Sequence, residues 1–157
     1  MSRALAASVI GGLLGGLLGA GVMSVGHTLA SRLLPAAPAE PGEDATVKVG
    51  QSLSRAVRGR PLAEDEKPTA GTLVHYGFGA ALGATYGVVA ALVPAAAAAA
   101  YGAAFGVAAY LGPHAIVVPA LGLAPSPLRR PPAQEALELV LHVLYGLTVE
   151  AVRRLFH

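Results

Sequence analysis

The stretch that decides the fold is "SVIGGLLGGLLGAGVM", from Ser8 to Met23. It holds no charged residue, and its apolar residues do not alternate with polar ones at the period of an amphipathic helix. The apolar run extends outward from Ala4 to Leu34, beyond the roughly 20 helical residues that cross a hydrocarbon core. The run is therefore typical of a membrane-spanning helix.

The composition of the whole chain agrees with lipid as the solvent. Of 157 residues, 54% are hydrophobic and 13% are charged, whereas a soluble domain carries about 25% charged residues. Mean hydropathy is +0.59. The absence of cysteine excludes disulfides, zinc–thiolate sites and iron–sulfur clusters. A net charge of +2 gives no support for nucleic acid as a partner.

The first apolar run has an alternative interpretation as a signal peptide, because Arg3 precedes it. The run is about twice as long as a signal-peptide core, and no small-x-small cleavage site follows promptly. The nearest candidate is "APA" at Ala37 to Ala39, well beyond the run. We expect an uncleaved transmembrane helix.

Three further apolar segments follow, separated by proline-containing punctuation. The four predicted spans are 4–34, 71–93, 95–123 and 134–156. The predicted fold is an all-α membrane protein, a four-transmembrane-helix bundle that forms a single membrane domain over residues 1–157. The third span is overlong and contains Pro113 and Pro119, so its helix is expected to kink or break after about Gly112.

The polar region 35–70 between the first two spans contains one further predicted helix, at about 44–59. Asp44 would cap it, and a set of small and apolar residues would share one face. This set comprises Ala45, Val49, Leu53, Ala56 and Val57. Lys48, Arg55 and Arg58 occupy the rest of the surface. Such a basic amphipathic insert suits an anionic membrane surface, and a solvated helix packed on the spans is the alternative.

Glycines recur every fourth residue in three of the spans, the shortest series being Gly102 and Gly106 in the third. The predicted packing residues are Gly11, Gly15, Gly19, Gly79, Gly83 and Gly87. Small residues at this spacing let helix backbones approach closely in lipid, although a composition rich in glycine and alanine also produces such spacings by chance. The same faces could join copies of the chain or a different subunit, so a homo- or hetero-oligomer is a further possibility.

Ionisable residues inside the predicted spans are the candidates for function, because burying them in lipid is costly. They are His27, His75, His114, His142, Glu138 and Glu150. In four antiparallel spans, the end of the first, the start of the second, the end of the third and the start of the fourth lie on one side. All four imidazoles then share one half of the membrane. The predicted cluster comprises His75, His114, His142 and Glu138, with Tyr86 and His27 as possible neighbours.

Several roles are open for this cluster. Imidazoles change charge between about pH 5 and 8, so protonation could push helices apart. Neutral imidazoles on facing helices can also bind haem or a metal, although no cofactor is expected from any motif. An accessory or scaffold subunit of a larger membrane complex is a third possibility. Each histidine could instead only satisfy a backbone carbonyl or bond across helices. No hydrolase, P-loop, dinucleotide or zinc-protease motif is present, which favours a protein that is not an enzyme.

Two segments carry a family resemblance: "HAIVVPALGL", from His114, and "LELVLHVLYGLTVEAVRR", which contains Glu138, His142 and Glu150. The second span, with His75 and Tyr86, is similar too. On these residues the sequence resembles the YagU-like inner-membrane proteins, a bacterial family of unknown biochemical activity. The resemblance implies a multi-pass protein of the bacterial inner membrane and implies no catalytic residues.

Overall fold

The computed structural model describes residues 2–33, 42–92 and 98–156, and every regular element in this part of the chain is helical. In chain order the elements are α1 (Arg3–Leu33), α2 (Ala45–Arg58), η1 (Glu64–Glu66), α3 (Lys67–Ala90), α4 (Ala98–Ala109), η3 (Tyr110–Val117), α5 (Val118–Ala120), η4 (Pro127–Arg129) and α6 (Pro132–Arg154). The predicted all-α class is therefore confirmed.

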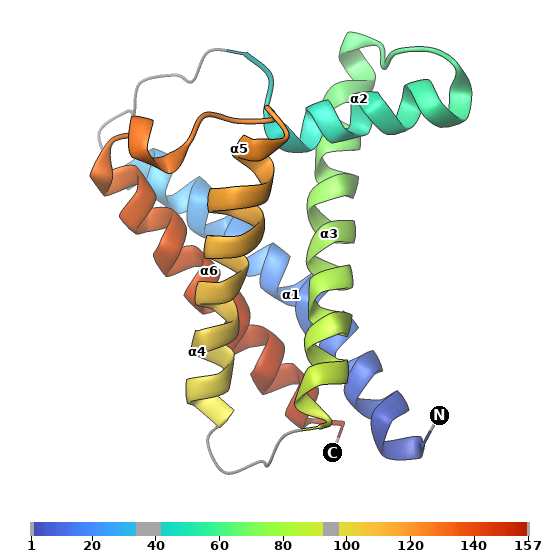
Figure 1. The fold of residues 1–157 in the computed structure, drawn as a ribbon, viewed down its shortest axis with the longest axis vertical. Helices are drawn as coiled ribbons and strands as arrows, with labels where there is room; N and C mark the ends of the chain where they lie inside the picture. The colour runs from blue at the N-terminus through green and yellow to red at the C-terminus, as the bar shows by residue number, and fades with distance from the viewer. Residues whose placement is uncertain (1, 34–41, 93–97, 157) are drawn as a thin grey trace.

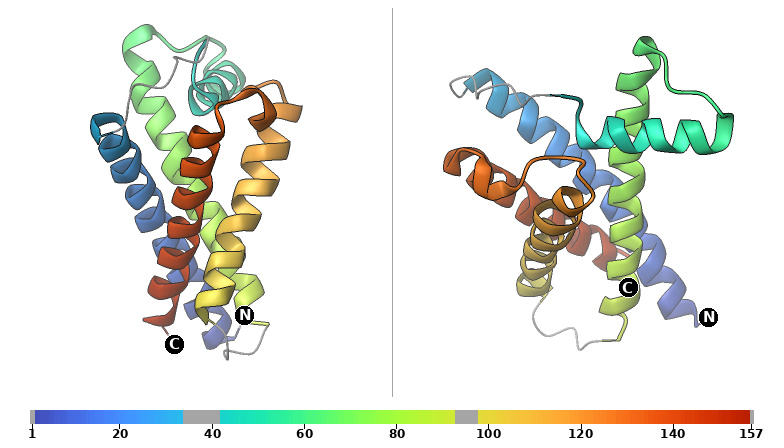
Figure 2. Two further views of the ribbon diagram at one scale, coloured as in Figure 1. Left: turned by 90° about the vertical axis from the view of Figure 1, so that its left-hand side faces the viewer. Right: turned by 45° about the horizontal axis from the view of Figure 1, so that its top comes forward.

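The bundle is formed by α1, α3, α6 and the continuous succession of α4, η3 and α5, and α2 lies across one end of it (Figure 1). Helix α1 packs against both α3 and α6, and α6 packs in turn against α4. Helix α2 packs against α3. Both ends of the chain lie at the end of the bundle away from α2 (Figures 1 and 2).

Three helices, not the predicted four, are long and apolar enough to cross a membrane: Arg3–Leu33, Glu64–Ala90 and Ala100–Ala120. Helix α6 fails this criterion because Glu135 and Glu138 lie near its start, and Glu150, Arg153 and Arg154 lie near its end. The prediction of four spans that are each apolar enough to cross a membrane is therefore wrong for α6. The predicted limits at Leu34, Val93 and Ala95 fall outside the described residues.

The crossing of α1 and α3 is built on glycine. A Cβ added to Gly12 would collide with the carbonyl oxygen of Gly83, and one added to Gly83 would collide with that of Gly12. Gly16 stands in the same relation to Gly79. No larger residue fits between the two backbones, so the glycine spacing fixes how closely these helices approach.

Helix α6 meets its two neighbours in the same way. Toward α1, a Cβ on Gly15 would lie 2.8 Å from the Cα of Val149, and one on Gly19 would lie 2.6 Å from the ring of Tyr145. Toward α4, a Cβ on Gly106 would collide with the carbonyl oxygen of His142. Of the remaining predicted packing residues, Gly11 faces α6 and Gly87 faces α1.

The helix of the third predicted span, here called the third helix, consists of α4, η3 and α5 in succession. It continues through Pro113 and does not break. Regular α-helix gives way to π-helix over Tyr110–Val117 and resumes at Val118. The wider π-turn accommodates the ring of a proline, which cannot donate the usual hydrogen bond. His114 follows the proline within this stretch, which places its ring beside α6.

The helix expected at 44–59 is α2, and Asp44 caps it by accepting a hydrogen bond from the backbone N–H of Thr46 at 2.8 Å. Its packed face is not the predicted apolar one. Gly50 and Ser54 are the buried residues, whereas Val57 is 83% exposed. The second half of the apolar stripe, Leu53, Ala56 and Val57, is therefore exposed, whereas Ala45 and Val49 are half-buried.

Candidate functional site

A cavity of about 580 Å³ lies at the end of the bundle that α2 covers. His27 of α1, His75 of α3, His114 of η3 and His142 of α6 all line it, and so does Glu138 of α6. The structure thus brings together five of the six residues that the sequence predicted to cluster. The remaining histidine of the chain, His157, lies outside the described residues.

Antiparallel packing explains the convergence. His27 lies near the end of α1 and His114 near the end of its helix, whereas His75 lies near the start of α3. The ends and starts of successive helices meet at one level of the bundle. His142 is the deepest in its own helix, ten residues from Pro132.

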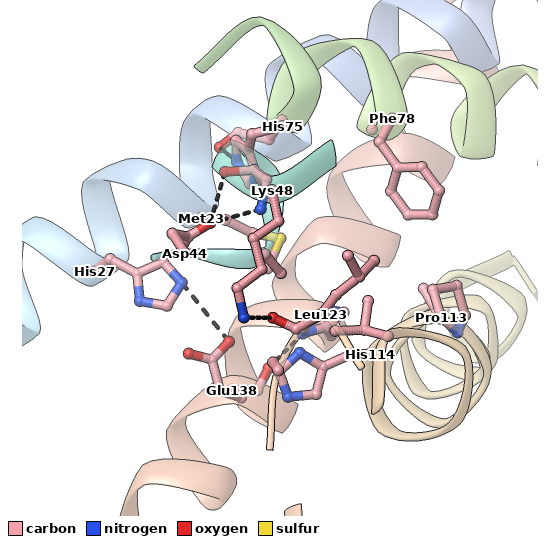
Figure 3. A pocket seen from close by; sticks show the side chains of 18 of the residues that line it. Met23, His27, Asp44, Lys48, His75, Phe78, Pro113, His114, Leu123 and Glu138 are labelled. Carbon is pink, nitrogen blue, oxygen red and sulfur yellow. Dashed lines mark hydrogen bonds and ion pairs between the residues drawn. The ribbon is translucent and has the colours of Figure 1, made fainter. Parts of the chain in front are cut away.

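Two of the histidines face carboxylates. The Nε2 of His27 lies 3.7 Å from Oε2 of Glu138, and the Nε2 of His114 lies 3.5 Å from Oε2 of Glu135. Figure 3 shows His27 and Glu138 pointing toward one another from α1 and α6. Both distances are longer than a good hydrogen bond, so a proton on either imidazole would strengthen the pair by charge.

The other two histidines are held by backbone carbonyls. The Nε2 of His75 lies 3.1 Å from the carbonyl oxygen of Ala20, and the Nδ1 of His142 lies 2.7 Å from that of Glu138. A carbonyl only accepts, so each of these ring nitrogens carries the hydrogen. In the neutral ring the opposite nitrogen is then an acceptor. A bond from α3 to α1 thus fixes the tautomer of His75, and a bond within α6 fixes that of His142.

Tyr110 ties the third helix to the start of α6. Its hydroxyl donates to Oε2 of Glu135 at 2.7 Å, and its ring stacks on that of His114 with centroids 5.2 Å apart. His142 lies edge-on to the same ring, and the His114 and His142 rings are 5.2 Å apart. Glu135 also accepts from Arg130 at 3.3 Å. Glu135, Arg130 and Tyr110 were not among the predicted site residues.

The roof of the cavity is formed by the start of α2 and the loop after α5. The ammonium group of Lys48 reaches across and donates to the carbonyl oxygen of Leu123 at 2.6 Å (Figure 3). This bond joins residues 75 positions apart in the sequence. The start of α2 and the loop after α5, which are far apart in the sequence, therefore close the cavity together.

Tyr86, the sixth predicted residue, does not line the cavity. Its hydroxyl donates to Oε2 of Glu150 at 2.9 Å, near the end of the bundle that holds the chain termini. Arg153 donates to both oxygens of Glu150, at 2.8 and 3.0 Å, and to the hydroxyl of Ser8 at 3.3 Å. Tyr86 thus belongs to a second polar cluster, here named the Glu150 network: Ser8, Tyr86, Glu150, Arg153 and Arg154.

The chain matches a known protein family. The family model DUF1440, described as a protein of unknown function, matches residues 15–151. The chain belongs to the DUF1440 family. No curated protein and no solved structure matches it. The matched range contains every residue of the cavity cluster, and the family assigns no activity to any of them.

The positions of the side chains in the cavity can be compared with those that a metal site needs. Within the described residues, no three side chains of His, Asp or Glu converge as ligands of one ion. Each imidazole is instead oriented by its own carbonyl or carboxylate.

Proposed function

We propose that this DUF1440 chain is a multi-pass protein of the bacterial inner membrane, as the YagU-like resemblance implied, in which α6 crosses the bilayer together with the three apolar helices. Helix α6 packs along α1 and α4, which provide it with neighbours other than lipid. All of its charged residues except Glu138 are paired: Glu150 is 3% exposed and bonds Arg153 and Arg154, and Glu135 bonds Arg130. Paired charges inside a bundle are tolerated at membrane depth.

In the proposed arrangement α2 lies in the membrane interface. Leu53 and Val57 are 55% and 83% exposed on its apolar side. Arg55 and Arg58 are exposed on the same helix. A helix of this composition buries its apolar face among acyl chains while its basic residues meet anionic headgroups.

We propose further that the cavity is a proton-responsive site, and that the protein changes conformation when its histidines are protonated. One observation carries this proposal: four imidazoles from four separate helical segments line one cavity. Because each histidine belongs to a different helical segment, a proton on one of them would change the electrostatic energy between its own segment and the others. Charge changes of this kind, between about pH 5 and 8, are the usual basis of histidine switches.

Protonation adds attraction in the histidine–carboxylate pairs of the cavity and repulsion between His114 and His142. A proton on His27 or His114 would place its charge beside a carboxylate, that of Glu138 or Glu135. A second charge on His142 would then lie about 5.2 Å from that on His114. At an effective dielectric constant of about 20, two such charges repel by roughly 3 kcal/mol. We therefore expect the first protons to be tolerated and the later ones to separate α6 from the third helix.

The test is thermal stability of the purified protein in non-ionic detergent as a function of pH. We expect the melting temperature to fall as the pH drops from about 7 to 5, where imidazoles become charged. His142→Leu is expected to flatten this fall. His142→Asn is the matched variant, because its amide can still donate to the carbonyl of Glu138 but cannot be protonated in this range.

A flat profile in both variants supports titration of His142 as the cause. If the Asn variant keeps the wild-type fall and the Leu variant loses it, the histidine acts only through its hydrogen bond. An unchanged profile in both variants would exclude His142 from any proton response.

A further inference from the structure

We infer that the cavity binds a small organic cation, a protonated amine on an apolar or aromatic body, with Glu138 as its counter-charge. This inference rests on the proposed function, since the cation and the protons would compete for one site. The cavity, at about 580 Å³, is of the size that takes small organic ligands.

Three side chains supply acceptors on the lining, beside the amide of Gln134, which both donates and accepts. His75 and His142 each use their N–H on a backbone carbonyl, so each neutral ring retains an acceptor nitrogen. The carboxylate of Glu138 is an acceptor as well. Within the described residues it accepts no hydrogen bond, and His27 lies 3.7 Å from it. A ligand that donates hydrogen bonds and carries positive charge fits such a lining.

The other charged groups around the cavity are engaged elsewhere. Lys48 donates to the carbonyl of Leu123, and Arg130 donates to Glu135. At the roof, Glu43 pairs with Lys67 at 2.6 Å, and Asp44 caps α2. Glu138, whose side chain is 15% exposed, remains as the acidic group that faces the cavity from α6.

The remaining walls are apolar and aromatic. Met23, Phe78, Leu82 and Tyr145 line the cavity beside Glu138. Figure 3 shows the ring of Phe78 on α3, across the cavity from Glu138 on α6. Aromatic rings attract organic cations through their faces, and the apolar surface buries the body of the ligand.

Histidine protonation links this site to the proposed switch. His27, His75, His114 and His142 all face the space that the cation would occupy. When they are charged they repel it, together with Lys48 and Arg130 from the roof side. We therefore expect the cation to bind the neutral cavity at high pH and to be released at low pH.

The experiment compares three probes of one shape and different charge: phenethylamine, 2-phenylethanol and 3-phenylpropionate. Their affinities for the full chain in non-ionic detergent are measured by titration calorimetry at pH 8 and pH 5. We expect phenethylamine to bind most tightly at pH 8 and to weaken at pH 5. Loss of one charge-assisted contact in Glu138→Gln should weaken binding about tenfold or more. Glu64→Gln, which removes an exposed carboxylate outside the cavity, should leave it unchanged.

Tighter binding of 3-phenylpropionate than of phenethylamine, equal binding of all three probes, or binding of none would overturn the inference. So would phenethylamine binding that is unaffected in Glu138→Gln. If that variant does not fold, the ranking of the three probes on the unchanged protein decides the matter. The ligand-free pH profile separates the two proposals: a flat profile with binding of the amine that depends on Glu138 at pH 8 removes the switch and retains the cation site.

Discussion

Glu150 and Glu138 lie on the same helix, twelve residues apart, in opposite circumstances. At the end of the bundle that holds the chain termini, Glu150 accepts hydrogen bonds from Tyr86, Arg153 and Arg154. At the end covered by α2, the carboxylate of Glu138 accepts no hydrogen bond from the described residues and faces a cavity.

The difference separates a structural role from a functional one. A buried charge whose bonds are all made inside the protein holds helices together and has nothing left to offer a ligand. A partly buried charge beside a cavity retains its capacity for a proton or another partner. Both ends have tightly packed glycines nearby, so the contrast lies in the polar residues and not in the backbones.

The sharpest test of this comparison replaces each carboxylate by its amide. Glu150→Gln leaves Arg153, 7% exposed, without its ion pair, and breaking a buried pair in this way costs about 3–5 kcal/mol. Glu138→Gln loses only a long contact to His27, so we expect a change of about 1 kcal/mol or less. Unfolding in detergent, followed by circular dichroism, measures both.

Equal destabilisation by the two substitutions would remove the distinction between a structural end and a functional end. A larger loss in Glu138→Gln would reverse it. In either event the cavity would be a packing feature, and the cluster would satisfy only the internal bonds of the bundle.

The histidine cluster could be predicted because it depends on depth alone. Counting residues from the ends of antiparallel helices placed four imidazoles in one half of the bundle, and they line one cavity. Tyr86 was misplaced because it was assigned by its helix face and not by its depth. It shares a helix face with His75, but eleven residues at about 1.5 Å each put it about 16 Å further along the helix. A shared face is not a shared level.

Other features depend on contacts that a linear pattern does not contain. Lys48 meets Leu123 only because α2 folds across the end of the bundle. Glu135 lies beside Tyr110 because the start of α6 packs against η3. The count of apolar spans failed at α6, where packing against α1 and α4, and not composition, decides the surroundings of the charges.

A second prediction concerns the glycine crossing that both ends share. Gly83→Ala places a methyl group against the backbone of Gly12 and Gly16, and overpacking of this kind costs about 1–3 kcal/mol. Gly77→Ala, on the same helix, has nothing within 4 Å of the added carbon and should be neutral or slightly stabilising. The two melting temperatures in detergent are compared directly.

If Gly83→Ala is as stable as Gly77→Ala, α1 and α3 do not pack as closely as the structure shows. The cavity would then lose its fixed wall, because Gly79, the cavity-lining glycine one helical turn away, belongs to the same crossing. The contrast between Glu138 and Glu150 could then no longer be explained by a cavity at one end of the bundle.

The smallest expected effect on stability, and the most direct test of where the α2 end lies, comes from Val57→Trp. The chain has no tryptophan, so this residue would be the single indole in the protein. Val57 is 83% exposed, and the substitution should leave stability within about 0.5 kcal/mol. In vesicles with anionic lipid, lipids brominated near the headgroup should quench its fluorescence, because an interfacial helix buries its apolar face about 5–10 Å deep. Replacing Leu53 by serine in the same variant should reduce the quenching. An indole quenched by aqueous iodide and untouched by the brominated lipids would place α2 in water, and the cavity beneath it would then open to solvent and not to the membrane surface.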